Sequence, residues 1–586
     1  MARIAGLQSP NGIENRAMTT CLPHRTAFPA LVLAVAAGCA GPSEPEPVDL
    51  VVRGGAIHTA DARNPVAEAL AVRDGRFVFV GDAREAERWI GEATDVIELN
   101  GRAVIPGLID GHVHLESGLS LIRGVDLTGI ADRDEWMRRI AARAAELGPG
   151  AWIVGGRWDH TLSGGEFPSL EELDPVTPEN PVLLSDIDGH TAWANSLALE
   201  IAGVEATTPD PPGGRILRYA SGDPTGILLE TAGGLVEEHV PPLSSDEERE
   251  IMRQTFRAAA RLGLTGVHTM AGLDRIPAYV GFGADGELPL RVWYGAFGAE
   301  DRVDELAGAR DDARSALATV TAERGPTFEV GYAKLMADGV LSARTAALLA
   351  PYADAPDESG FMVTGFDDLA GAVTRIHEAG FPVAIHAIGD RAVRVSLDAF
   401  ERAASSGPRP GLADRIEHIE VLDPEDAPRF EELGVLASFN PHHCITGIDV
   451  YNTDRLGESR AAWSFAWGAV RDAGATLVFG SDWATAPLDP LRQLYAATVR
   501  EKPAGGPPGG WYPGQRVSWR EALTAYTLAP AAASGWDGEI GSIEVGKWAD
   551  FVVLNAAVPD PPDASILDLR VDSTWLGGAS TYRAER

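Results

Sequence analysis

Two histidines separated by one residue end an apolar run, VIPGLIDGHVHL, at residues 104–115. Alternate side chains of a β-strand share a face, so His112 and His114 can point together into one cavity. Imidazole pairs at this spacing suit a single metal ion. Because paired histidines also occur on solvated strands, the pair alone is a moderately specific signal.

Further residues that can bind or bridge a metal follow other apolar, β-rich runs of the chain. These runs are separated by helix-like stretches, and this alternation predicts βα units around a parallel sheet. The residues in question are Lys334, His386, His418 and Asp482.

Eight strand-like runs can be placed between the paired histidines and Asp482. Eight such units predict an α/β fold of the (β/α)8 TIM-barrel type, which carries its chemistry at the C-terminal ends of its strands. The candidate ligands fall at those ends. The predicted strands span residues 108–114, 265–269, 291–296, 328–336, 382–386, 414–418, 435–439 and 475–482.

Six motifs follow one another along the chain and together cover nearly everything from about residue 48 to the C-terminus. They are PGLIDGHVH (106–114), KLMADG with RTAALL after it (334–339, 344–349), IHAIGDRAV (385–393), RIEHIE (415–420), GSDW (480–483) and IGSIEVGKWADFVVL (540–554). In these motifs the chain resembles the amidohydrolase superfamily, and within it the amidohydrolase-3 branch with its YtcJ-like and N-substituted formamide deformylase-like members.

The resemblance implies a binuclear centre of two divalent metal ions, most commonly zinc. One ion would be held by His112, His114 and Asp482, and the other by His386 and His418. Lys334 would bridge them as a carboxylysine, the carbamate that a lysine amine forms with CO2.

The composition of the chain supports a special role for Lys334. Only three of the 49 basic residues are lysines, so a position that needs positive charge alone would usually hold arginine. Arginine stays protonated, whereas a desolvated lysine can lose its proton and react. The alternative is a buried ion pair, for example with Asp338.

Such a centre predicts a metal-dependent amidohydrolase that cleaves a non-peptide carbon–nitrogen bond, of amide, N-acyl or N-formyl type, through a metal-activated bridging hydroxide. Asp482 would be the catalytic residue that carries a proton to the leaving amine. The substrate would be a small-molecule amide. Two alternatives remain: a lactonase or esterase on the same site, and a non-catalytic metal-binding surface lipoprotein.

Substrate contacts are predicted for His190, Asp338, His443 and Trp483. His190 lies in the segment DGHTAWANS, and a solvated loop histidine is the alternative. His443 follows an Asn-Pro pair where the family often has Gln-Pro. Cys444 invites a Cys/His catalytic interpretation, but a small buried hydrophobe is the favoured interpretation.

Outside the barrel, assigned to residues 106–530, the two chain ends (48–105 and 531–586) are expected to form a small β-sandwich, as the resemblance implies. Asp74-Gly75 predicts a hairpin turn in it. A stretch of about 116–263 predicts a lid-like insertion after the first barrel strand that sets substrate choice. Its last helix would begin with a Ser245-to-Glu248 capping box and end at Gly263. Residues 503–510 predict a plain surface loop.

The first 38 residues resemble a bacterial lipoprotein signal, with Met18 as the expected true start, although a buried apolar element is the alternative. Cys39 would be lipidated and residues 39–47 would form a tether. We therefore expect an exported, membrane-anchored lipoprotein, periplasmic or on the cell surface. A net charge of −36 argues against nucleic acid as a partner and limits membrane contact to the lipid anchor. A homodimer is left open.

Overall fold

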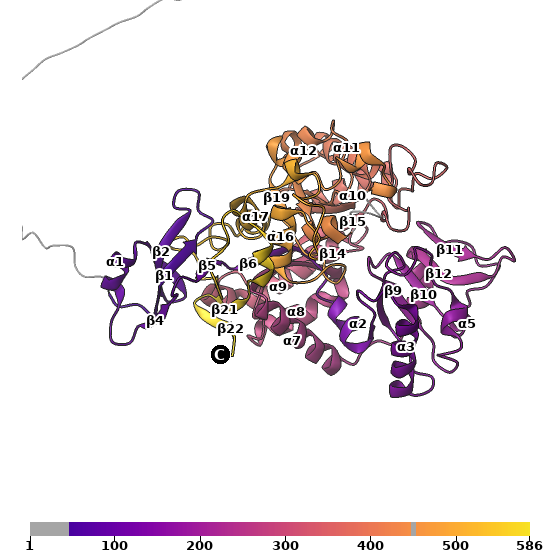
Figure 1. Cartoon of the computed structure of the whole chain (residues 1–586), viewed down its shortest axis with the longest axis horizontal. Coiled ribbons are helices and arrows are strands. Elements are labelled where there is room, and N and C mark those ends of the chain that lie inside the picture. The colour runs from indigo at the N-terminus through magenta and orange to yellow at the C-terminus, as the bar shows by residue number, and fades with distance from the viewer. Residues whose placement is uncertain (1–45, 447–452, 586) are drawn as a thin grey trace, which may run out of the picture. The chain divides into compact units, whose positions relative to one another are not determined.

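The computed structural model describes residues 46–446 and 453–585. The expected signal region, Cys39 and most of the expected tether lie outside the described residues. The described chain contains three sheets with the helices that cover them (Figure 1).

Eight parallel strands form the central sheet, in the order β19-β18-β17-β16-β15-β14-β13-β6. All the predicted barrel strands are present, and the last of them is shorter than expected. The predicted TIM barrel is confirmed. The strands are β6 (Leu108–Val113), β13 (Leu264–Gly272), β14 (Arg291–Phe297), β15 (Phe328–Met336), β16 (Val383–Ala387), β17 (Arg415–His418), β18 (Leu436–Phe439) and β19 (Leu477–Phe479).

The first and last barrel strands meet through the segment that follows β19. The Asp482 backbone N–H donates to the His112 carbonyl oxygen at 2.7 Å, and the Ser481 N–H donates to Asp110 Oδ1 at 2.8 Å. A Cβ on Gly480 would lie 2.3 Å from the His112 nitrogen, so only glycine permits this approach. The closure therefore brings His112 and Asp482 side by side, although 370 residues separate them.

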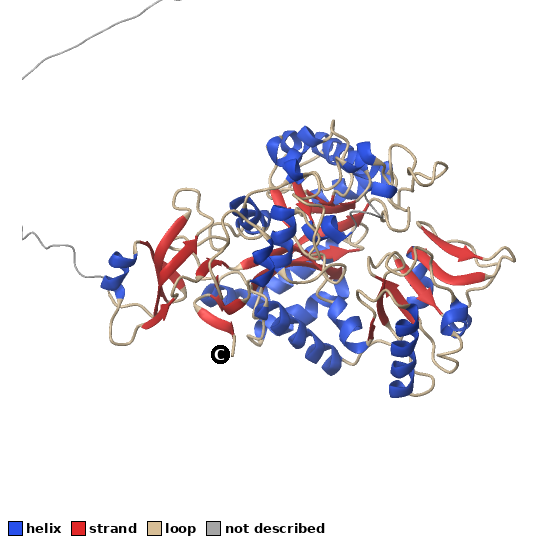
Figure 2. Cartoon of the chain, viewed as in Figure 1, coloured by secondary structure: helices blue, strands red, loops and turns tan. Residues whose placement is uncertain are grey.

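Helices, drawn in blue in Figure 2, surround the barrel strands, drawn in red. Their apolar faces bury against the sheet, as in α7, where Ile251, Met252 and Phe256 are buried while its first turn is acidic. The main barrel helices are α7 (Ser245–Arg261), α8 (Ile276–Ala284), α9 (Val303–Arg324), α10 (Phe366–Glu378), α11 (Asp390–Ser406), α12 (Ala427–Leu433), α13 (Pro441–Thr446), α14 (Glu458–Ala461), α15 (Trp467–Asp472), α16 (Pro490–Val499), α17 (Trp519–Ala525) and α18 (Leu528–Ala533).

The capping box of α7 lies one residue earlier than predicted. Ser244, not Ser245, is the N-cap, because its backbone is still extended and its hydroxyl accepts from the Glu247 N–H. The Glu247 carboxylate accepts in return from the Ser244 N–H at 3.1 Å. The prediction of Ser245 and Glu248 was therefore wrong by one position, and the helix ends just before Gly263 as expected.

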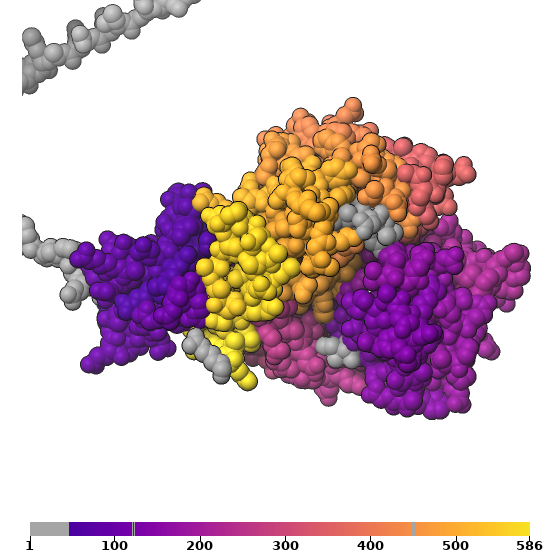
Figure 3. Space-filling view, viewed as in Figure 1, coloured from indigo at the N-terminus to yellow at the C-terminus, as the bar shows by residue number. Residues whose placement is uncertain are grey.

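Both chain ends contribute to a second sheet, ordered β22-β21-β20-β5-β1-β2-β3 with β4 beside β1. The indigo and yellow segments lie side by side in Figure 3. The predicted turn at Asp74-Gly75 joins β2 to β3, and both residues have positive φ. The strands are β1 (Leu50–His58), β2 (Val66–Arg73), β3 (Arg76–Gly81), β4 (Asp95–Glu98), β5 (Ala103–Pro106), β20 (Phe551–Leu554), β21 (Val571–Leu576) and β22 (Ala579–Arg583).

The insertion after β6 has its own mixed sheet, ordered β11-β12-β10-β9-β8-β7, and its own tryptophan-rich core. Within the described residues, no helix combines the length and the apolar character needed to cross a membrane. The insertion contains β7 (Val125–Asp126), β8 (Gly155–Trp158), β9 (Leu183–Asp186), β10 (Thr191–Ala194), β11 (Gly214–Arg218), β12 (Pro224–Glu230), α2 (Ser117–Arg123), α3 (Arg133–Leu147), α4 (Leu170–Leu173), α5 (Ser196–Ala202) and α6 (Gly234–Glu237).

Candidate metal centre

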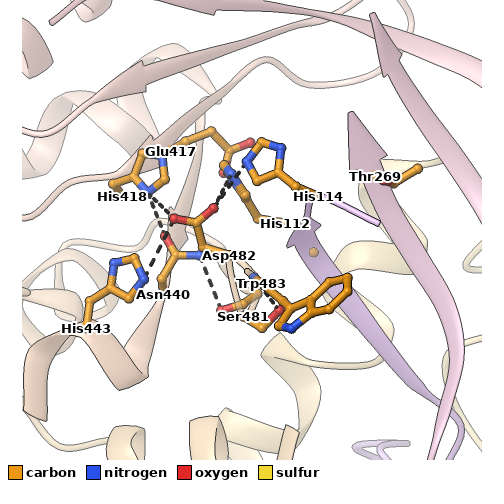
Figure 4. A network of polar contacts seen from close by, with 12 residues as sticks. His112, His114, Thr269, Glu417, His418, Asn440, His443, Ser481, Asp482 and Trp483 are labelled. Carbon is orange, nitrogen blue, oxygen red and sulfur yellow. Dashed lines mark hydrogen bonds and ion pairs between the residues drawn. The ribbon is translucent and has the colours of Figure 1, made fainter. Parts of the chain in front are cut away.

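Asp482 lies at the centre of four imidazoles at the C-terminal end of the barrel (Figure 4). Its Oδ1 is 3.3 Å from His112 Nε2 and 3.2 Å from His114 Nε2. Its Oδ2 is 3.9 Å from His418 Nδ1 and 3.7 Å from His443 Nε2. Burial raises the pKa of Asp482, but the neighbouring histidines outweigh burial and hold it well below its usual range. The carboxylate is therefore ionised at neutral pH.

Two groups of donor atoms are close enough to hold a metal ion, each with its atoms within 4.8 Å of one another. They are His112 with His114 and Asp482, and His418 with His443 and Asp482. The first group is the first predicted ligand set. The second group contains His443 where the predicted set has His386.

His386 nevertheless lies beside the second group. Its ring centre is 4.5 Å from that of His418, in an edge-to-face arrangement. Its Nε2 is 3.1 Å from the Gly339 carbonyl oxygen, so Nε2 carries the proton and Nδ1 keeps its lone pair. Burial lowers the pKa of His386 and of His418 well below the usual range, which keeps both rings neutral, as metal ligands must be.

Acceptors behind the barrel histidines fix their proton positions. His112 Nδ1 is 2.7 Å from Glu417 Oε2, and His418 Nδ1 is 2.8 Å from Asn440 Oδ1. With the proton on Nδ1, each ring is left with a free lone pair on Nε2. His112 Nε2 is buried and has no hydrogen-bond partner among the described residues, although Asp482 is close. An unpaired buried nitrogen of this kind fits a cation.

Lys334 is on β15, with only 2% of its surface exposed, and lines the same cavity. Burial lowers its pKa to about 8, against the opposing effect of Glu417 and Asp482. A substantial fraction of its amine is therefore neutral at physiological pH. Within the described residues Lys334 forms no ion pair, with Asp338 or with any other carboxylate, so the ion-pair alternative that the sequence left open is not observed.

Asp338 lies behind the cavity wall rather than on it. It is fully buried, and its carboxylate accepts the backbone N–H groups of Ile388, Gly389 and Ala347 at 2.8 to 2.9 Å. Its role in the structure is to join the loops that follow β15 and β16. This corrects the prediction that Asp338 contacts substrate, because its oxygens are already engaged.

The centre opens into a cavity of about 1340 Å³ that barrel and insertion line together. Lys502, Pro503 and Ala504 also line it, so the start of the predicted surface loop borders the cavity rather than only solvent. Of the residues predicted to bind metal or substrate, those that line the cavity are His114, His190, Lys334, His386, His418, His443, Asp482 and Trp483.

The insertion places a charged histidine on the cavity wall. His190 Nδ1 is 2.6 Å from Glu230 Oε2. Burial lowers the pKa of His190, but Glu230 and nearby aspartates outweigh it and raise it to about 9. His190 is therefore not the solvated loop residue that was its alternative. Burial also raises the pKa of Asp186 to about 8 and that of Asp188 to about 6.

Sequence reasoning missed Glu417 and Asn440, which orient the metal-side histidines. Arg415 and Glu417 form a buried ion pair at 2.6 Å. Charged residues at alternate positions of a buried strand, as in RIEH, were the available signal, since such residues share one face. Cys444 is a buried residue whose pKa burial raises to about 11, in keeping with its interpretation as a small hydrophobe.

Comparison with known proteins gives one family and several relatives. The Amidohydrolase family model matches residues 95–582. Protein LONG AFTER FAR-RED 3 of Arabidopsis thaliana is 35% identical and is covered over 91% of each chain. Putative amidohydrolase YtcJ of Bacillus subtilis is 30% identical over 90% of this chain and 98% of its own. N-substituted formamide deformylase of Arthrobacter pascens is 29% identical over 91% and 98%.

Two solved structures also resemble this chain in sequence and fold. Uncharacterized metal-dependent hydrolases from Pyrococcus furiosus and Pyrococcus horikoshii superpose with TM-scores of 0.65 and 0.66, at 28% and 26% identity. They cover 86% and 88% of this chain, and 98% of their own chains. With a family model that spans most of the sequence and a barrel that carries the histidines at its strand ends, the chain belongs to the amidohydrolase family.

Proposed function

We propose that this protein is a metal-dependent hydrolase that cleaves the carbon–nitrogen bond of a small-molecule amide of N-acyl or N-formyl type. The observation that carries the proposal is the Asp482 carboxylate, placed among four imidazoles in a cavity that the buried Lys334 also lines. The name of the Arthrobacter relative, an N-substituted formamide deformylase, supports the choice of bond.

Two divalent ions, which we propose to be zinc, fit these residues. His112, His114 and Asp482 would hold one ion, while His386 and His418 would hold the other, with the carbamate of Lys334 between them. Two observations support this assignment. Each of His112, His386 and His418 has an acceptor on one ring nitrogen, which leaves the other free for a metal, and Nε2 of His112 has no hydrogen-bond partner among the described residues. When bound, such ions lower the pKa of water and polarise a carbonyl group.

The side chains around the centre have separable roles. Asp482, ionised and next to the reacting position, accepts a proton from water and delivers it to the leaving amine. His190, held protonated by Glu230, donates a hydrogen bond into the cavity. Trp483 and His443 border the same space and limit the orientation of the substrate.

Metal analysis and a substrate panel test the proposal. The protein as purified should contain about two equivalents of metal, and chelation should abolish hydrolysis, which added zinc should restore. The panel should include N-formyl and N-acyl amines, cyclic amides, lactones and simple esters. Turnover of lactones or esters alone would reject carbon–nitrogen hydrolysis, and metal content without any turnover would indicate a binding protein.

We propose further that the mature chain is exported and anchored through a lipid on Cys39. The support is the lipobox-like sequence AAGC at residues 36–39. Palmitate labelling that Cys39→Ala abolishes, with release of the protein from membranes, is the expected result. An unlabelled protein that keeps its residues from Met18 onward would contradict this proposal.

A further inference from the structure

Arg157 differs from the other buried arginines of the described chain in having no partner. Arg291 is paired with Asp550 at 2.6 Å and Arg415 with Glu417 at 2.6 Å. The other two also have acceptors: Arg455 donates to Asp354 and to the Ser342 carbonyl oxygen, and Arg500 donates to the carbonyl oxygens of Trp511 and Phe465.

Arg157 is only 8% exposed, its Nε is buried without a hydrogen-bond partner, and it lines the cavity that contains Lys334 and Asp482. Among the described residues it forms neither an ion pair nor a hydrogen bond through its side chain. A buried guanidinium without an acceptor lowers the free energy of unfolding. Its position at a cavity wall therefore indicates that a ligand supplies the acceptor.

The backbone at Arg157 and at the two residues before it has an unusual conformation. Arg157 has a φ of 61°, a left-handed backbone conformation that residues other than glycine rarely adopt. The two residues before it are Gly155 and Gly156, where a Cβ would meet the carbonyl oxygens of Val125 and Ser185 at 2.6 and 2.4 Å. β8 can therefore lie between its neighbours only with glycines there. Arg157 shares a positive φ with His418, Asp482 and other described non-glycine residues, and this strained conformation is compatible with a functional position.

The acidic residues that act electrostatically on Arg157 are Asp126, Asp482 and Asp188, and all three have other partners. Asp126 accepts from the backbone and hydroxyl of Thr128, and Asp188 accepts from the Ser342 hydroxyl. None of them forms an ion pair with the guanidinium, and burial lowers the pKa of Arg157 to about 10 against the opposing effect of these carboxylates, so the side chain is still protonated at neutral pH. The fork of N–H donors remains available for a planar oxyanion.

We propose that Arg157 binds a carboxylate of the substrate, so that the hydrolysed molecule is an N-acylated or N-formylated amino acid rather than a neutral amide. This inference rests on the proposed carbon–nitrogen hydrolysis and narrows its substrate class. Because Arg157 and the metal-side residues line one cavity, the carboxylate and the scissile bond can be bound together.

Matched pairs of substrates test the inference with the metal-loaded, full-length protein. Each pair is an N-acetyl or N-formyl amino acid and its carboxamide, for example N-acetylleucine and N-acetylleucinamide. For the wild type we expect kcat/KM to favour the acid by roughly 10- to 100-fold. Arg157→Gln should remove this preference by slowing the acid, while the rate on the carboxamide stays within about twofold.

Two further variants keep the comparison interpretable. Arg138→Gln removes the same charge from an exposed position on α3 of the same insertion and should keep the preference for the acid. Arg157→Lys keeps the charge without the planar fork and should give an intermediate preference. Equal rates of the wild type on both members of a pair, or an equal loss on both in Arg157→Gln, would overturn the inference.

A binding measurement separates this inference from the proposed function. N-acetylleucine is titrated calorimetrically into Asp482→Asn and into Asp482→Asn combined with Arg157→Gln. Binding that is lost with Arg157, together with no hydrolysis of any pair by the wild type, would support the carboxylate site and reject amide hydrolysis of this class. Hydrolysis of carboxamides without preference, or carboxylate binding that survives Arg157→Gln, would reject the carboxylate site alone.

Discussion

Three histidines on the barrel and one histidine on the insertion border one cavity but differ in protonation. Burial lowers the pKa of His114, His386 and His418, which leaves these three barrel rings neutral, whereas Glu420 and Asp482 raise the pKa of His443 against burial. On the insertion, Glu230 keeps His190 protonated. Neutral rings can bind cations, and a charged ring can only donate hydrogen bonds. The barrel side therefore suits metal binding and the insertion side suits substrate recognition.

Replacement of Lys334 should give the largest effect on the barrel side. Lys334→Met and Lys334→Arg cannot form a carbamate, so both should lose metal and hydrolysis together. Lys334→Ala should regain part of its activity with formate, acetate or propionate, which can supply two oxygens in place of the carbamate. Metal analysis and turnover of the same samples check this prediction. Full metal content with activity in Lys334→Arg would exclude the bridge.

Removal of the proton acceptor should have the next largest effect. Asp482→Asn keeps the size of the side chain but cannot accept a proton from water. We expect turnover to fall by about 100- to 10,000-fold. Circular dichroism and metal content measured in parallel show whether the fold and the centre persist. Near-normal turnover with normal metal content would mean that another group carries the proton.

Replacement of Glu417, the acceptor behind His112, should have a smaller effect than the loss of Asp482. Glu417→Gln can still accept from His112 Nδ1, but its charge is gone and its pair with Arg415 is broken. Metal affinity should fall by about 10- to 100-fold. Competition with a calibrated chelator measures this change. Unchanged affinity would show that His112 does not depend on Glu417 for its orientation.

On the insertion side, Glu230→Gln should change the pH dependence of stability. The pKa of His190 is raised to about 9 in the folded protein, from 6.5. The resulting stabilisation is complete below the unfolded value and is lost as the pH rises through the folded one. Thermal midpoints of wild type and variant should therefore differ most near pH 6 and converge near pH 10. A constant difference across this range would contradict the charge assignment.

The smallest effect is expected far from the cavity. Ser244→Ala removes the N-cap of α7, the helix that leads from the insertion back to the barrel. The cost should be about 1 kcal/mol of stability with no change in turnover. Chemical denaturation with an activity assay checks both, and Ser245→Ala, one position into the helix, serves as the control. A comparable loss in Ser245→Ala would contradict the observed cap.

The two sides of the cavity also differ in how far the sequence could predict them. The barrel strands and their histidines follow from apolar runs that end in ligand-type residues, because strand ends meet at one edge of the barrel. His190 was predicted only as a substrate contact, and its partner Glu230 was not noticed. Their positions depend on how the insertion sheet packs over the barrel, a long-range arrangement that no local pattern encodes.

Asp338 and Ser245 show where prediction from the sequence fails for individual residues. An aspartate close to the predicted bridging lysine suggested substrate binding, but its carboxylate accepts one backbone N–H from its own loop, that of Ala347, and two from the loop after β16, those of Ile388 and Gly389. In the segment Ser244-Ser245-Asp246, either serine satisfies the capping pattern with a glutamate three residues on. Backbone geometry at the end of the loop, rather than residue type, decides which serine becomes the N-cap.

Diffraction data collected at the zinc absorption edge from crystals of the metal-loaded protein test the central claim most directly. A binuclear centre should give two anomalous peaks at the C-terminal end of the barrel. One should lie between His112, His114 and Asp482, the other beside His386 and His418, with additional density continuous with Lys334 Nζ. A single peak, or an unmodified Lys334 amine in crystals of fully active protein, would contradict the binuclear centre.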